Sequence, residues 1–303
     1  MLITHVIGIS MKQKSFGGKN MKTTNRYNLP VPLFKAMQSN EKEIQPNRIS
    51  VTTLIAPPLM RELSIEHWNE IEEDASEKLW ALLGSAVHLV LQKSGVGENF
   101  EVEKKFELSW DEMFNYPIKW VLVGYTDLID KTIKSIEDYK VTSVWSFLLG
   151  DKIEWEEQLN CYAYLAIRNG YEIEHLFINA ILRDWQVNKV GEEGYPEIPF
   201  WRKEISLWKI EEQEKYIKER LNLFSGEARE CTDEEKWKRG GKIALIQEGR
   251  KKALKLYNNE DEASKITLMK GQHFEKRKVD YFRCLNYCRV RKFCPYNIYK
   301  EEE

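Results

Sequence analysis

The spacing of hydrophobic residues in this chain changes from helical to extended and back within its first 185 residues. Pro57-Pro58 suits the start of a helix, so residues 59–93 are predicted to be mostly helical. The following apolar stretches are alternating or rich in β-prone residues, and a second helical stretch is closed by Gly170. The pattern therefore predicts three strands, a helix and a strand, near 100–108, 119–129, 133–142, 152–169 and 174–185.

Outside this core, the chain has a polar start and a predicted helical end. Residues 1–47 are rich in Lys and Asn, and about the first twenty are expected to be disordered. The core is assigned to residues 48–207. Helices are predicted near 208–230 and 233–257, so 208–303 is expected to be a helical C-terminal extension packed on the core. The predicted fold class is α/β, with a mixed β-sheet flanked by helices.

Composition favours a soluble enzyme over a membrane or secreted protein. Hydrophobic residues make up 42% of the chain and charged residues 31%, and no run of about 18 apolar residues occurs. Residues 1–10 are mildly apolar but have no basic region before them and no clear cleavage site, which argues against a secretory signal. We therefore expect a cytoplasmic, reducing environment, in which the five cysteines are thiols or metal ligands.

The net charge is −2, yet basic residues are concentrated near the end of the chain. Residues 270–300 carry nine basic side chains and two acidic ones. Such a segment is suited to holding a nucleic-acid backbone, which needs positive potential only where phosphates pass. A solvated cationic end, balanced by acidic segments elsewhere, is the alternative. The nine residues are Lys270, Lys276, Arg277, Lys278, Arg283, Arg289, Arg291, Lys292 and Lys300.

Two neighbouring predicted strands bring carboxylates and a lysine together. A turn near Asp130 would make these strands an antiparallel hairpin. Side chains two apart on a strand share a face, so Asp138 and Lys140 point the same way and Tyr139 points opposite. The turn places Asp127 roughly diagonal to Asp138, within ~7–8 Å, a gap that one divalent cation can bridge. Phosphodiester cleavage needs such a set: oxygen ligands for a hard cation and a positive group near the attacking water.

These residues and their neighbours resemble the PD-(D/E)XK nuclease superfamily, and more narrowly its RecB-type exonuclease branch, which includes AddB-like and CRISPR-adaptation nucleases. The likeness covers roughly residues 80–185, and a weaker likeness to phage-type members continues to the C-terminal cysteines. It implies a restriction-endonuclease-like core that hydrolyses DNA with Mg²⁺ or Mn²⁺, as an exonuclease in recombination or DNA-end processing, where a protein partner is also expected. The motifs, in the family's order, are Gly84-Ser-Ala-Val-His88, Glu103 in Val102-Glu-Lys-Lys-Phe106, Asp127, Asp138-Tyr-Lys140, and Gln158-Leu-Asn-Cys-Tyr162.

The resemblance also implies roles for individual residues around the cation. His88, Asp127, Asp138 and Tyr139 match positions of the metal shell, and an imidazole among oxygen ligands suits Mn²⁺ as well as Mg²⁺. Without its companions, His88 is better explained as a hydrogen-bonded core residue. Lys140 is implied to orient the attacking water or to stabilise transition-state charge, and the alternative for it is an ordinary surface lysine on a strand.

Three further residues are implied to support the cation or the substrate. Glu103 would hold a second cation or a metal-bound water. It shares a predicted strand face with Glu101, so a solvated face is the alternative, and only motif position selects Glu103. Gln158 and Tyr162 lie four apart on one helix face and are implied to contact DNA phosphate and base together. An amphipathic helix with a half-buried tyrosine is the alternative for this pair.

Three cysteines lie within eleven positions near the end of the chain. They resemble the three-cysteine end of iron–sulfur-containing RecB-type nucleases, in which a fourth cysteine lies before the histidine helix. Here Pro57-Pro58 occupies that region, and Cys231 is the alternative fourth ligand. Four thiolates suit Zn²⁺ or a [4Fe–4S] cluster equally, and structural thiols without metal are the alternative. The four candidates are Cys231, Cys284, Cys288 and Cys294.

Two other classes of function fit parts of the sequence. A DNA-binding protein that keeps the fold without cleaving would use the basic, cysteine-rich C-terminus as a binding module, but the carboxylates and the lysine are all present. A phosphate-binding ATPase built on Gly240-Gly241-Lys242 is disfavoured, because no strand is predicted before this segment and the loop-glycine spacing is absent. Metal-dependent DNA hydrolysis is therefore the function that the sequence predicts.

Overall fold

The computed structural model describes residues 21–38, 44–45, 47–94, 97–110, 120–148, 152–227, 229–250 and 252–299. The predicted disorder of the first twenty residues lies outside these ranges. The described structure begins with β1 (Lys22–Thr24), which pairs in parallel with β3 (Glu72–Asp74), and α1 (Val31–Met37) follows β1 in the chain. Part of the segment predicted as a tail is therefore folded. Each helix of the described residues is too short or too polar to cross a membrane.

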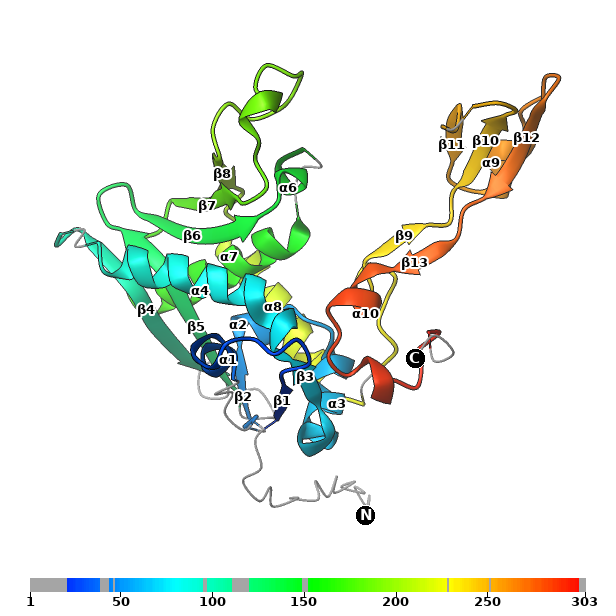
Figure 1. The fold of residues 1–303 in the computed structure, drawn as a ribbon. Coiled ribbons are helices and arrows are strands. Elements are labelled where there is room, and N and C mark those ends of the chain that lie inside the picture. The colour runs from blue at the N-terminus through cyan, green and yellow to red at the C-terminus, as the bar shows by residue number, and fades with distance from the viewer. Residues whose placement is uncertain are drawn as a thin grey trace, which may run out of the picture.

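A mixed sheet forms the centre of the described structure, as predicted, and it has six strands (Figure 1). Its order is β2-β5-β6-β7-β8, and β4 pairs with the other edge of β5. The pairs β2–β5 and β6–β7 are parallel, and the others are antiparallel. The strands are β2 (Arg48–Ser50), β4 (Phe100–Ser109), β5 (Val121–Asp130), β6 (Ser135–Thr142), β7 (His175–Leu182) and β8 (Phe200–Ile205).

One edge of β5 is left open in its middle. β4 occupies the opposite edge, whereas β2 pairs only with residues 121–123 and β6 only with residues 128–130. Between these two points, Tyr139 N donates to the Asp127 carboxylate at 2.7 Å. The turn that joins β5 to β6 spans residues 131–134. A carboxylate is therefore placed at a break in the ladder, where it is accessible from the sheet edge.

Helices pack against this sheet. The crossover helix between the parallel strands β6 and β7 contacts β4, β5, β6 and β7. It ends as predicted, because Gly170 takes a φ of 88° just after the helix, a conformation that glycine adopts without strain. This helix is α7 (Ile153–Arg168), and α2 (Val51–Leu54) and α8 (Ile210–Ser225) contact it. The other helices of this part of the molecule are α4 (Leu79–Gln92), which contacts β6, and α6 (Val144–Leu148).

Gly124 in β5 allows α7 to approach the sheet closely. A Cβ atom at this position would lie 2.7 Å from Leu165 Cδ1 and 2.9 Å from Tyr162 Cδ1. Both distances are shorter than side-chain packing tolerates, so a larger residue would push the helix away. The glycine thus keeps α7 against the strand that carries Asp127.

Residues 59–93 are mostly helical, as predicted, but β3 interrupts the segment between α3 (Pro58–Glu66) and α4. The break centres on Asp74, which is 1% exposed. Its carboxylate accepts hydrogen bonds from Thr24 Oγ1, Arg26 N and Ser76 N. An aspartate that bonds to backbone N–H groups favours a cap or a turn over a helix interior.

The predicted helix over residues 233–257 is wrong, and the C-terminal extension is only partly helical. Residues 238–281 form a β-rich arm that projects from the body of the molecule (Figure 1). Gly240 and Gly241 have φ angles of 75° and 73°, which an α-helix excludes. The elements of the arm are β9 (Lys238–Gly240), β10 (Ile243–Gln247), β11 (Lys255–Tyr257), α9 (Glu260–Ser264), β12 (Gln272–Lys276) and β13 (Val279–Tyr281).

The end of the chain packs against the N-terminal segment. After α10 (Phe282–Asn286), Val290 joins a small apolar cluster with Met21 and Ile71. The rings of His67 and Phe293 stack with their centroids 4.0 Å apart. The basic C-terminal segment is therefore anchored to the body on one side and to the arm on the other.

Candidate active site

Three side chains converge beside the open edge of β5. His88 projects from α4, Glu103 from β4 and Asp127 from β5. One nitrogen or oxygen atom from each lies within 4.8 Å of the other two. His88 Nδ1 is 3.3 Å from Asp127 Oδ1 and 3.7 Å from Glu103 Oε1. All three side chains are partly exposed, so the cluster is open to an ion or a substrate.

Glu103 reaches the cluster from an irregular point of β4. Its φ is 51°, and the register of β4 and β5 omits the pair of Glu103 and Asp127 although the neighbours on both sides are paired. A left-handed conformation at a non-glycine residue costs ~1–3 kcal/mol and persists only where the surroundings hold it. Glu101, its predicted neighbour on the same face, instead accepts a hydrogen bond from Tyr171 Oη at 2.9 Å. The backbone therefore distinguishes Glu103 from the other glutamates of this strand.

Asp138 and Lys140 lie on β6 beside this cluster and share a face, as predicted. Lys140 Nζ is 2.7 Å from Asp138 Oδ2. The last pair of β5 and β6 is Leu128 with Glu137, so the next residue of each strand sets Asp127 opposite Asp138 rather than diagonal to it. Tyr139 contributes its backbone N–H to Asp127, while its side chain belongs to the other face of the sheet. The two aspartates therefore come from adjacent strands at the break in the ladder.

Gln158 of α7 connects the buried carboxylate and the lysine. Its Nε2 donates to Asp138 Oδ1 at 3.2 Å and to Tyr162 Oη at 3.0 Å, and its Oε1 accepts from Lys140 Nζ at 3.1 Å. Gln158 and Tyr162 are 9% and 6% exposed. These bonds give both residues a positioning role, which the sequence argument missed although their shared helix face pointed to a common target. Their predicted contact with DNA is not tested by this arrangement and stays a prediction.

The pKa shifts of the site follow from carboxylates that are crowded and partly buried. Burial raises the pKa of the Asp138 carboxyl, against the attraction of Lys140. Burial, and then the charge of Asp127, raise the pKa of Glu103. The hydrogen bond with Asp127 raises the pKa of His88. Negative charge is thus gathered where a cation would relieve it.

The donor atoms fit a hard or borderline divalent cation. Asp138 Oδ2 is buried and accepts no hydrogen bond of ordinary geometry from the described residues, although the Lys140 ammonium lies close to it. A buried carboxylate oxygen in that state still has a lone pair to offer. Carboxylates suit Mg²⁺ and Mn²⁺, and an imidazole extends the choice to transition ions.

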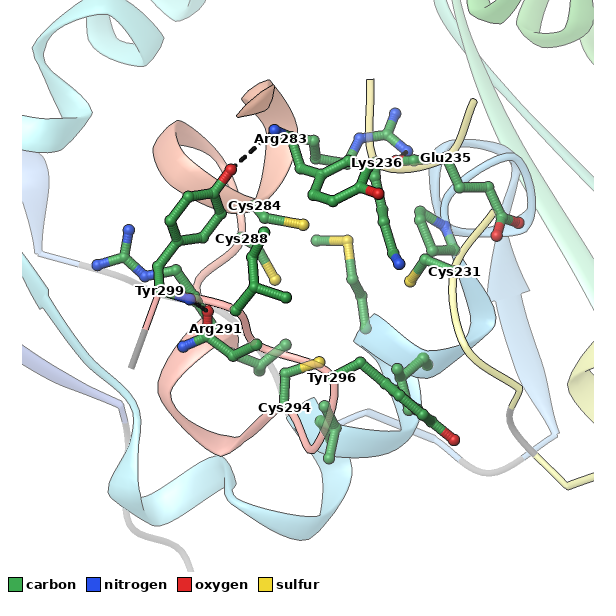
Figure 2. Close-up of a pocket in the computed structure, with 18 residues that line it drawn as sticks. Cys231, Glu235, Lys236, Arg283, Cys284, Cys288, Arg291, Cys294, Tyr296 and Tyr299 are labelled. Atoms are coloured by element: carbon green, nitrogen blue, oxygen red, sulfur yellow. Dashed lines mark hydrogen bonds between the residues drawn. The ribbon is translucent and has the colours of Figure 1, made fainter. Parts of the chain in front are cut away.

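A second group of candidate ligands lies at the base of the arm. The four cysteines Cys231, Cys284, Cys288 and Cys294 line one cavity of about 40 Å³, and their sulfur atoms are directed toward it (Figure 2). Burial raises the pKa of Cys231 to about 12 and that of Cys288 to about 11. Lys236 also lines this cavity. The predicted fourth cysteine, Cys231, is therefore in place beside the other three.

The sulfur spacing bears on what this cavity can hold. In the described part of the chain, no three cysteine sulfurs lie within 4.8 Å of one another. A tetrahedral zinc site with Zn–S bonds of ~2.3 Å has its sulfurs ~3.8 Å apart. A four-iron cluster is also held by four thiolates but around a larger body. The four thiols would therefore hold Zn²⁺ only after the side chains move inward, whereas a [4Fe–4S] cluster needs a wider spacing of its four thiolates than zinc does.

Comparisons with known proteins give distant likenesses. No protein-family model matches the chain, and no curated protein matches it. Its structure is similar to the crystal structure of SSO0001, with 20% identity, a TM-score of 0.43 and coverage of 63% of this chain and 83% of that one. It is also similar to a phage related exonuclease from Haemophilus somnus 129PT, with 15% identity, a TM-score of 0.34 and coverage of 58% and 91%. Neither likeness assigns a role to any residue.

Proposed function

We propose that this protein is a DNA nuclease that depends on Mg²⁺ or Mn²⁺, and that it acts as an exonuclease in recombination or DNA-end processing. The observation that carries the proposal is the convergence of His88, Glu103 and Asp127 beside the paired Asp138 and Lys140. Oxygen-rich ligands next to a fixed ammonium group are what metal-assisted phosphodiester hydrolysis requires.

The residues divide the work by their positions. Asp127, Asp138 and His88 would hold the cation, together with the backbone of Tyr139, and Glu103 would hold a second cation or a water. The bound cation lowers the pKa of water and neutralises phosphate charge. Lys140, held by Gln158, presents its ammonium group to the attacking water or to the charge that develops on the phosphate.

The four cysteines have a structural role in this proposal. They would bind a [4Fe–4S] cluster, or Zn²⁺, that joins the segments on either side of the arm, because Cys231 precedes the arm and the other three follow it. Iron would colour anaerobically purified protein brown, whereas zinc would leave it colourless but detectable by elemental analysis. Protein free of both metals, with its cysteines reduced and its fold intact, would contradict this part of the proposal.

Cleavage of end-labelled DNA tests the central claim. Single- and double-stranded DNA is incubated with Mg²⁺, Mn²⁺ or EDTA, and the wild type is compared with Asp138→Asn and Lys140→Met. We expect cleavage with either cation, none in EDTA, and none by either variant. Lys105→Met is the matched control, because Lys105 is an exposed lysine on the same sheet, and it should cleave like the wild type.

The pattern of results separates the proposal from its alternative. Undiminished cleavage by purified Asp138→Asn or Lys140→Met would reject the assigned site. Tight DNA binding by a folded wild-type protein that cleaves nothing with either cation would instead support the non-cleaving DNA-binding protein.

A further inference from the structure

Three basic side chains near the active site form no salt bridge with any residue that the structure describes. They come from separate segments: the residue before α7, the residue after β7, and β9 in the arm. All three are exposed, and each has its cationic group near an aromatic ring. Lys152 Nζ is 4.8 Å from the ring of Trp155, Arg183 Cζ is 4.6 Å from that of Trp80, and Arg239 Cζ is 3.6 Å from that of Phe282.

Contacts of the first turn of α7 hold the base of the arm near Lys152. Glu154, in the first turn of α7, accepts hydrogen bonds from Trp237 Nε1 and, at 3.2 Å, from Arg283 Nη2. Trp237 lies directly before β9, so this contact fixes Arg239 two residues later. Arg183 is placed by a separate contact. Its backbone N donates to Thr142 O at 2.9 Å, at the end of β6, the strand that carries Lys140.

The positive charges of Lys152, Arg183 and Arg239 are close enough to repel one another. The pKa of Lys152 is lowered, first because its surroundings partly desolvate the ammonium group although the side chain stays exposed, and then, against the attraction of Glu154, by repulsion from Arg183, Lys140 and Arg239. Asp184, the acidic neighbour of Arg183, accepts a hydrogen bond from Val144 N at 2.7 Å and so is bonded to the backbone. Cations that repel one another and have no carboxylate partner are stabilised by an external anion.

We propose that Lys152, Arg183 and Arg239 form a phosphate-binding track, which holds the backbone of a single-stranded polynucleotide between the active site and the base of the arm. This inference rests on the proposed nuclease function and deepens it. Trp80, beside Arg183, is 63% exposed and offers an indole on which a base stacks. A positive groove combined with aromatic side chains is a general way to bind single strands without sequence preference.

The track gives the arm a part in substrate binding. Arg239 belongs to β9, whereas Lys152 and Arg183 belong to the body, so a bound strand would bridge the two. The track also continues the line of positive charge from Lys140, whose ammonium group is already committed to Asp138. The bound polynucleotide would therefore run from the cation site beside the sheet toward the arm.

Affinity for a fluorescent single strand of about 20 nucleotides tests the track, measured in EDTA so that no cleavage is needed. We expect Lys152→Gln, Arg183→Gln and Arg239→Gln each to weaken binding about 3- to 10-fold and to reduce the slope of log affinity against log salt concentration by about 0.7. Lys218→Gln on α8 and Lys265→Gln in the arm are matched controls, because they remove the same charge elsewhere on the exposed surface, and should bind like the wild type.

A duplex of the same sequence is the second ligand. Trp80→Ala should weaken single-strand binding by at least several-fold and duplex binding less, because paired bases are not free to stack on the indole. Larger losses for the duplex than for the single strand would overturn the single-strand assignment.

The failure of this inference is distinguishable from that of the proposed function. Track variants that bind the single strand like the controls, in a protein that still cleaves DNA with Mg²⁺, would overturn the track alone. A wild type that binds no polynucleotide and cleaves none would overturn both. The expected losses of affinity in a protein that cleaves with neither cation would support the track and reject the nuclease.

Discussion

The two candidate metal centres of this protein differ in how their ligands are held. The active-site ligands come from adjacent strands and helices of the main sheet, and the strand register and the α7 contacts fix them. The cysteines come from loops and a short helix on either side of an arm of more than forty residues. The first centre therefore has its geometry before any cation binds, whereas the second depends on whatever the sulfurs hold.

The ligand chemistry also distinguishes a catalytic first centre from a structural second centre. Carboxylates with raised pKa values and an imidazole exchange hard cations readily with solvent, which suits a cation that takes part in a reaction. Thiols must lose protons to bind a metal, and those of Cys231 and Cys288 have raised pKa values in its absence. Metal loss should therefore stop the chemistry at the first centre and loosen the structure at the second.

The largest effect is expected when the active-site cation is removed. EDTA, or Asp127→Asn, should lower cleavage by about a thousandfold or more, since a bound cation contributes several kcal/mol and each ~1.4 kcal/mol is a factor of ten. The unfolding temperature of Asp127→Asn should change little, because the sheet and not the cation positions the ligands. Glu107→Gln, on an exposed face of β4, is the control for charge loss. A large drop in the unfolding temperature of Asp127→Asn would break the contrast between the two centres.

Gln158→Ala is expected to have the next largest effect, about 10- to 100-fold on cleavage, as is usual for a residue that orients metal ligands. The loss should appear in kcat, because Gln158 holds Asp138 and Lys140 and is itself buried. Steady-state kinetics on a short single-stranded DNA distinguishes a residue that positions Asp138 and Lys140 from a residue that contacts DNA. A raised KM with unchanged kcat would instead favour the DNA contact that the sequence motif implies.

The parts of this site that the sequence predicted are those set by local spacing. Asp138 and Lys140 share a face because side chains alternate on any strand, and that needs no knowledge of the rest of the fold. The choice of Glu103 over Glu101 could not be made from residue types, since it depends on a backbone φ of 51°. The link from Gln158 to both residues of β6 depends on how closely α7 packs, which Gly124 permits.

Errors in the predicted fold have similar causes. The mostly helical stretch over 59–93 has an interruption at Asp74 that was not predicted, because its partners Thr24 and Arg26 lie about fifty residues earlier. Residues 233–257, which include the first part of the arm, were predicted as a helix although Gly240-Gly241 argues against one, because the apolar residues fit both periods over a short stretch. The convergence of Cys231 with the C-terminal cysteines followed from counting ligands, but their spacing required the structure.

Cys288→Ser tests the second centre, and its effect on cleavage is expected to be smaller than that of the active-site variants. It should leave cleavage of a short oligonucleotide within a few-fold of wild type but expose the segment after the arm to protease about tenfold sooner. A clip that closes the long loop between Cys231 and Cys284 removes chain entropy from the unfolded state, and that stabilisation would be lost. Single-strand binding should also weaken, because Arg239 lies at the loosened base.

Cys161→Ala is the matched control for this variant, since Cys161 is buried in the main core away from the cavity. Limited proteolysis followed by mass spectrometry locates the first cuts. Equal protease resistance of Cys288→Ser and the wild type, with no iron or zinc in either, would mean that the cysteines are structural thiols.

Tyr162→Phe should have the smallest effect. Burial raises the pKa of Tyr162, so its hydroxyl stays protonated, and the hydrogen bond that it accepts from Gln158 Nε2 contributes about 0.5–1.5 kcal/mol. The ring, which packs at Gly124, is retained in the variant, so α7 should keep its place on the sheet. We therefore expect cleavage to fall only a few-fold, with the Mg²⁺ dependence of the rate unchanged. If titration shows that Tyr162→Phe needs far more Mg²⁺, the hydroxyl acts on the cation itself, and the division between metal ligands and positioning residues is wrong.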